Sequence, residues 1–138
     1  DLDTASGEIS NALVDPYTPD SRFVVSRPPV DLGGIAHIRK FVKDPAEMLV
    51  ISFDLSGDLQ IGEQLIGPFT LSIRTTAGTD ASPVDVLNGQ PAFNVDKTLI
   101  MQPVKGGTPE CDYQIKVVVP TSNPHKVLVL SCLLQVRS

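Results

Sequence analysis

The sequence predicts one small all-β domain preceded by an extended N-terminal arm. Twelve Pro and ten Gly interrupt the 138 residues so often that only short segments remain between them, as all-β domains require. From about residue 46 onward, apolar and polar residues alternate with the period of a half-buried strand. Because 41% of the residues are hydrophobic, a chain of this length can bury one core of its own.

Residues 1–42 are predicted to form the arm, because they show no sustained period. Residues 15–20 are a turn cluster, and the segment Arg27-Pro28-Pro29-Val30 favours extended backbone. Between them, 21–26 is predicted to be one short strand. The arm has apolar residues that are too many for a solvated linker and too scattered for a separate core: Tyr17, Phe23, Val24, Val25, Ile35, Ile38 and Phe41. We expect it to bind neighbouring subunits or a larger assembly. The alternative is a tail folded back on its own domain.

Residues 43–138 are predicted to form the domain. Leu49, Ile51, Phe53 and Leu55 share one face of its first strand. Seven segments are predicted to be strands: 49–55, 69–74, 84–87, 93–95, 98–102, 111–119 and 126–136. This number of short strands, separated by turns, is typical of an immunoglobulin-like antiparallel β-sandwich. Tyr113, at the start of the penultimate strand, stands where such sandwiches carry a tyrosine whose hydroxyl bonds to upstream backbone.

The last two predicted strands form a hairpin around residues 120–125. The second of them is apolar at nearly every position from Val127 to Val136, which is typical of a strand covered on both faces. If Val117 faces Lys126, Cys111 falls opposite Cys132. The two thiols are then either buried small hydrophobes or a cross-strand disulfide, which would imply an oxidising compartment. Two thiols alone are too few ligands for a zinc site.

Candidate catalytic and metal residues are few. His37 and His125 have no Ser or Cys arranged around them in the sequence, and no Gly-rich phosphate loop is present. Asp54 and Asp58 resemble a fragment of a calcium loop without its twelve-residue pattern, so we expect them to cap a turn. The net charge of −5 disfavours nucleic acid as a partner, and no apolar stretch is long enough for a membrane span. We therefore expect no catalysis, cofactor or metal.

Short motifs from residue 43 onward resemble a family of small virion proteins of tailed bacteriophages, the fibre–tail adaptor or head-fibre-like proteins. The resemblance rests on the following motifs, in this order: Lys43-Asp44-Pro45 with Glu47, Ile51-Ser52-Phe53-Asp54, Gly62-Glu63 closing a first hairpin, Gly106-Gly107, Tyr113 and Thr121-Ser122. The chain departs from the family pattern at Leu55, where Trp is usual, and at Glu63, where Asp is usual, and its arm has no counterpart. The resemblance implies an immunoglobulin-like structural virion protein that is assembled in the bacterial cytoplasm, where thiols stay reduced.

We therefore expect a non-enzymatic virion component that decorates or cements the capsid, or attaches at the head–tail junction or a fibre. Its expected partners are capsid or other virion proteins and further copies of itself, bound through the arm. The alternative is a secreted immunoglobulin-like adhesion module. Such modules usually expose aromatic residues for stacking, whereas the aromatic residues of this domain are on predicted inward positions: Phe53, Phe69, Phe93 and Tyr113.

Overall fold

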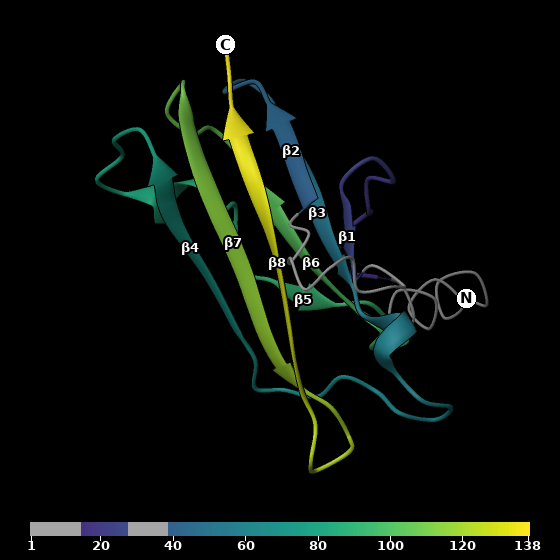
Figure 1. The fold of residues 1–138 in the computed structure, drawn as a ribbon. Helices are drawn as coiled ribbons and strands as arrows, with labels where there is room; N and C mark the ends of the chain where they lie inside the picture. Colours follow the sequence, from purple (N-terminus) through teal and green to yellow (C-terminus); the bar gives the residue numbers. More distant parts are fainter. Residues whose placement is uncertain (1–14, 28–38) are drawn as a thin grey trace, which may run out of the picture.

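The computed structural model describes residues 15–27 and 39–138, which form two four-stranded β-sheets packed together (Figure 1). The first sheet has the strand order β1-β3-β6-β5: β1 (Val24–Ser26), β3 (Leu49–Asp54), β6 (Leu99–Val104) and β5 (Ala92–Phe93). The second has the order β2-β8-β7-β4: β2 (Arg39–Lys43), β8 (Val127–Val136), β7 (Cys111–Pro120) and β4 (Thr70–Ala77). The prediction of an all-β fold is confirmed, and the two packed sheets are compatible with a β-sandwich.

Both sheets are mixed, which corrects the expected antiparallel arrangement. β1 runs parallel to β3, and β2 runs parallel to β8, whereas the other strand pairs are antiparallel. The two parallel strands come from the predicted arm, and the described residues contain eight strands rather than about seven. A local pattern could not show this, because pairing partners of parallel strands lie far apart in the chain.

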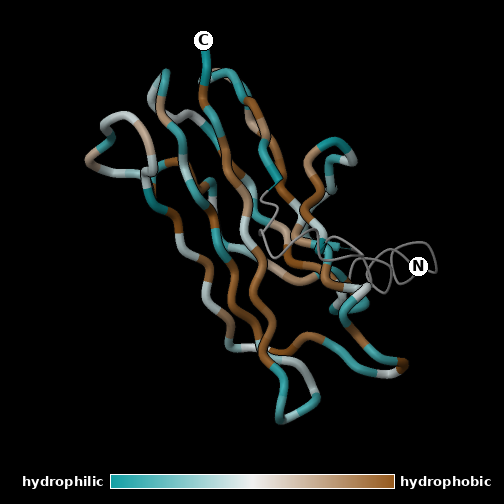
Figure 2. Tube along the Cα trace, viewed as in Figure 1, coloured by the Kyte–Doolittle hydropathy of each residue, from teal (hydrophilic) through white to brown (hydrophobic). Residues whose placement is uncertain are grey.

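The core lies between the sheets and is made by the alternation seen in the sequence. β7 buries every second side chain, among them Ile115 and Val117, and β3 buries Ile51 and Phe53. Figure 2 shows apolar segments running along β7 and β8, the strands at the centre of the second sheet. Each large apolar side chain buried here contributes about 1.5–3 kcal/mol.

β8 is covered on one face more fully than on the other. Leu128, Leu130 and Leu134 point into the core, whereas Val127 and Val129 on the opposite face are exposed. The expectation that both faces of this strand are covered is therefore wrong for its first half. The run of apolar residues does not distinguish an inward from an outward position.

Several turns differ from the predicted ones. Pro83–Val86 forms the 3-10 helix η2 instead of a strand, with Pro at its first turn, where its fixed φ is favourable. The chain leaves β3 through a second 3-10 helix, η1 (Ser56–Asp58), and crosses to β4 in the other sheet, so Gly62-Glu63 closes no hairpin between neighbouring strands. None of the helices in the described residues is long and apolar enough to cross a membrane.

Candidate interaction site at the N-terminal strap

Residues 15–27, which we call the strap, lie against the edge of the first sheet (Figure 1). β1 pairs with β3 over three residues only, from Val24 opposite Ser52 to Ser26 opposite Asp54. The pairing begins where the Ser52 N–H donates to the Phe23 carbonyl at 2.9 Å. Before that point the strap turns away from the sheet, because the Phe23 N–H bonds back to the Asp20 carbonyl at 3.0 Å.

The strap contributes to the hydrophobic core. Phe23 is 8% exposed and Val25 1%, and the ring of Phe23 lies 5.3 Å from that of Phe41 at an interplanar angle of 54°. Phe41 is itself buried on β2. The described part of the predicted arm therefore folds back on its own domain, and the boundary predicted between residues 42 and 43 falls inside β2.

Polar contacts fasten the strap at both ends. At its end, Arg27 Nε lies 3.1 Å from both carboxylate oxygens of Asp58, and its Nη2 donates to the Val129 carbonyl at 3.0 Å. At its beginning, the Asp15 carboxylate accepts the Val95 N–H at 2.7 Å. The Tyr17 hydroxyl donates to the Gln90 carbonyl at 2.6 Å. These partners belong to four different segments of the domain.

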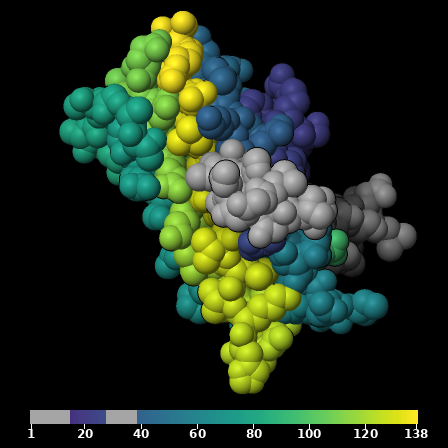
Figure 3. Space-filling view, viewed as in Figure 1, coloured from purple at the N-terminus to yellow at the C-terminus, as the bar shows by residue number. Residues whose placement is uncertain are grey.

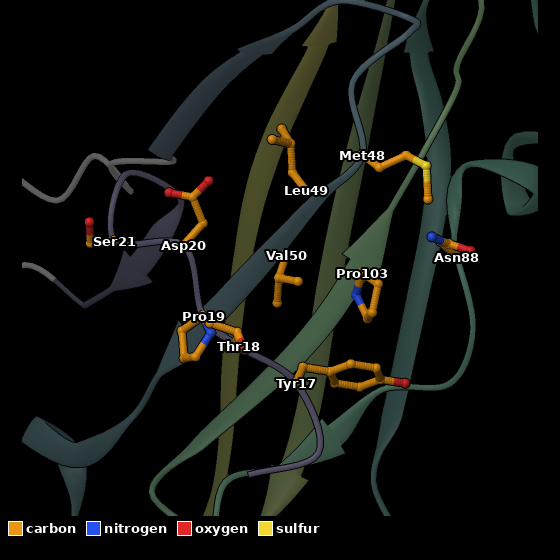
Figure 4. Close-up of a pocket in the computed structure, with 10 residues that line it drawn as sticks. All are labelled: Tyr17, Thr18, Pro19, Asp20, Ser21, Met48, Leu49, Val50, Asn88 and Pro103. Carbon is orange, nitrogen blue, oxygen red and sulfur yellow. The ribbon is translucent and has the colours of Figure 1, made fainter.

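An open groove of about 650 Å³ lies beside the strap (Figure 4). Its lining comes from the strap, from β3 with the residue before it, from the loop before β5 and from β6: Tyr17, Thr18, Pro19, Asp20, Ser21, Met48, Leu49, Val50, Asn88 and Pro103. Figure 4 shows Val50 in the middle of the groove, with Tyr17 at one end and Met48 at the other. The groove exists because the strap leaves the edge of β3 at Phe23 and does not continue alongside Leu49 and Val50.

The backbone of Val50 faces this groove. Ser52, two residues on, directs its N–H to the strap, so alternation along the strand directs the N–H and C=O of Val50 to the same side. The partner of Val50 on β6 is Pro103, which has no N–H. Within the described ranges, the backbone hydrogen bonds outside the strands include none to Val50. The groove therefore presents a short length of sheet edge.

A partly buried ion pair joins the loop after η1 to the β7–β8 turn. Glu63, whose side chain is 7% exposed, accepts bonds from the Thr121 hydroxyl at 2.6 Å, the Gln60 N–H at 2.8 Å and Lys126 Nζ at 3.0 Å. These bonds, that of Thr121 above all, lower the pKa of Glu63 to about 2. Lys126 Nζ also donates to the Asp58 carbonyl, which connects this cluster to the fastening of the strap.

The same loop carries a fully exposed apolar side chain at its tip. Ile61 has a relative accessibility of 107%. In Figure 3 this teal loop and the yellow-green β7–β8 turn project from the same end of the molecule. The Ser122 N–H donates to the Gln64 carbonyl at 2.8 Å, and the Gln64 N–H bonds to the Ser122 hydroxyl at 3.1 Å. The loop is thus held at Gln64 as well as at Glu63.

The Lys43-Asp44-Pro45 motif with Glu47 makes the turn from β2 to β3. The side chain of Lys43 is fully buried, and its Nζ donates to the carbonyls of Asp44 and Gly106. Burial lowers the pKa of Lys43. The Asp44 carboxylate accepts the Ala46 N–H at 2.8 Å, and the Glu47 carboxylate accepts the Asp44 N–H at 2.9 Å. The motif therefore has a structural explanation.

Tyr113 and Asp54 have local roles. The buried Tyr113 hydroxyl accepts the Thr108 N–H at 2.9 Å and donates to the Asp80 carboxylate at 2.6 Å. This is the predicted bond to upstream backbone, and it ties together the loops on either side of the sheet end. The Asp54 carboxylate accepts the Ser56 N–H at 3.0 Å, as expected of a turn cap.

The remaining sequence-predicted features are as follows. Ile35, Ile38 and His37 lie outside the described residues. Cys111 pairs with Val136, and Cys132 pairs with Ile115, so the predicted register is wrong by four residues. Both cysteines are free and buried, as one of the two alternatives proposed. Among residues 15–27 and 39–138, no group of three or more His, Cys, Asp or Glu could hold a metal ion.

The domain's aromatic side chains offer no ready stacking platform. Phe53 and Tyr113 are fully buried. Phe69 and Phe93 pack on each other, with ring centroids 4.9 Å apart at 49°.

Sequence reasoning missed the residues that fasten the strap, chiefly Arg27 and its partner Asp58, because no local pattern relates positions so far apart. Neither a family model nor a curated protein matches this chain.

Proposed function

We propose that this protein is a non-enzymatic structural component of a tailed-bacteriophage virion. It decorates or cements the capsid, or attaches at the head–tail junction or a fibre. The motifs from Lys43 to Ser122 support the family, and two packed sheets with the Tyr113 hydroxyl bond support an immunoglobulin-like sandwich. Its partners are capsid or other virion proteins and further copies of the chain.

The strap is the observation that carries the proposal. It binds by adding a strand to a sheet edge, which is a general mode of protein–protein recognition. Beside it lies a groove toward which the backbone N–H and C=O of Val50 point. A component that must bind a larger assembly needs such surfaces and needs no reactive centre. The net charge of −5 favours protein partners over nucleic acid.

Particle co-purification tests the proposal. Particles from the source are banded in a density gradient, and the chain is quantified against the major capsid protein by mass spectrometry. We expect a fixed ratio across the band that survives a salt wash. If the chain is absent from the band and is found in the medium of uninfected cells, the proposal is refuted and the secreted adhesion module takes its place.

A further inference from the structure

We propose that the strap is exchanged between copies of the chain. The site that residues 15–27 fill on their own domain is filled, in an assembly, by the same residues of a second copy. This inference rests on the assembly role proposed above and names its contact. It accounts for a segment that has the composition of a binding arm and yet lies on its own domain.

The docking site fits a second strap as well as the first. Its contacts are made by fixed parts of the domain: the edge of β3 at Ser52, the ring of Phe41, the Asp58 carboxylate and the Val129 carbonyl. An identical strap from a neighbour would make every one of these contacts. Exchange of an identical element between protomers is therefore a low-cost route to association.

The chain between the strap and β2 is long for the distance it bridges. The side chain of Arg27 bonds to β8 at Val129, and the backbone of Arg39 pairs with β8 at Cys132, three residues further along the strand. Three strand residues correspond to about 10 Å, whereas the eleven residues between Arg27 and Arg39 can reach about 36 Å when extended. The strap has enough chain to reach the equivalent site on an adjacent copy.

The strand pairing that release of the strap breaks is short, since β1 pairs with β3 over only three residues. Release also breaks the contacts of Phe23, Arg27, Asp15 and Tyr17 with the domain, and an exchanged strap makes all of these again. In dilute solution the tether keeps the strap on its own domain, because a short linker gives an effective concentration of about millimolar. On the surface of an ordered assembly, neighbouring copies are held at comparable concentrations. Exchange therefore belongs to the assembled state, and the structure of the single chain shows the closed form.

Charge reversal across the Arg27–Asp58 pair distinguishes the two forms. In the chain Arg27→Asp, residues 27 and 58 are both acidic, and in the chain Asp58→Arg both are basic, so in each the ion pair that fastens the end of its own strap is replaced by repulsion. When the two chains are mixed, exchange restores an opposite-charge pair at both sites of a heterodimer. The chain carrying both changes restores the pair within itself and is the matched control. Size-exclusion chromatography with light scattering measures mass, native mass spectrometry identifies the chains, and circular dichroism checks folding.

We expect the mixture to shift from monomer to heterodimer in excess of a statistical mixture, while each single variant alone and the double variant do not shift. If a single variant does not fold alone, the two are refolded together, and recovery of folded heterodimer supports exchange. Two results overturn the proposal: a mixture that is only the sum of its components, or equal dimerisation of each variant alone. Either result leaves the particle co-purification test unaffected, so the two proposals fail independently.

Discussion

Truncation of Phe23 to Ala measures whether the strap belongs to the folded domain in solution. Phe23 is 8% exposed and contacts the ring of Phe41, and truncating a buried Phe costs about 3–5 kcal/mol. We expect the lower limit, about 3 kcal/mol, because the site lies at a sheet edge where the strap can relax into the void. About 1 kcal/mol of this belongs to the contact between the two rings. For a domain of this size the melting temperature should fall by about 12 °C.

The assay is urea and thermal unfolding of the full chain at low micromolar concentration, followed by circular dichroism. Val24→Ala is the matched control, because Val24 is the next residue and is only half-buried. It should cost about 1 kcal/mol or less. A double-mutant cycle with Phe41→Ala should give a coupling of about 1 kcal/mol. If Phe23→Ala costs no more than Val24→Ala and the cycle shows no coupling, the strap is undocked in solution and the reasoning is refuted.

Three further predictions concern the rest of the domain. The folded-state pKa of Glu63, about 2, is below its ordinary value, so the stability that the Glu63 carboxylate contributes is present above about pH 4.5 and is lost as pH falls towards 2. The variant Glu63→Gln should therefore show a weaker dependence of stability on pH in acid unfolding curves, and a dependence equal to that of the unaltered chain would contradict the prediction. Tyr113→Phe removes the acceptor of the Thr108 N–H and should cost about 1–3 kcal/mol in urea unfolding, whereas a loss near zero would mean that water replaces the hydroxyl. Burial raises the pKa of Cys132 to about 12, so the Cys132 thiol should react with a thiol reagent at pH 8 only as fast as the chain unfolds. Fast labelling of Cys132 in the native protein would show that this thiol is accessible.

The elements with strong local patterns were predictable. β3, β7 and β8 follow from alternation or from long apolar runs, and the roles of Tyr113 and Asp54 follow from their positions beside turns. A run such as Val127 to Val136 shows that a strand exists but not which of its faces is covered. The hairpin register was missed because the centre of the turn lies two residues further along the chain than predicted. Pairing Val117 with Lys126 would centre it between residues 121 and 122, whereas Val117 pairs with Leu130, and the position of the turn sets the register.

The candidate site could not be predicted from local sequence. Phe23 and Val25 are apolar whether they bind another subunit or their own sheet, and the composition of the segment is the same in both cases. The choice is made by contacts such as Arg27 with Asp58 and with Val129, which join distant parts of the chain. Parallel addition to a sheet edge leaves no turn signal of the kind that marks a hairpin.

The pairing of β2 with β8 has a consequence for biosynthesis. Residues 39–43 pair with residues 132–136, so the ribosome makes most of the domain between the two strands. At about 5–20 residues per second, this takes roughly 5–20 seconds, during which β2 has emerged without its partner. The strap and β3 can meet much earlier, so the first sheet can begin to form before the second. A nascent chain therefore carries Phe41 uncovered by β8 for seconds, at the stage when neighbouring chains on the same message are also incomplete.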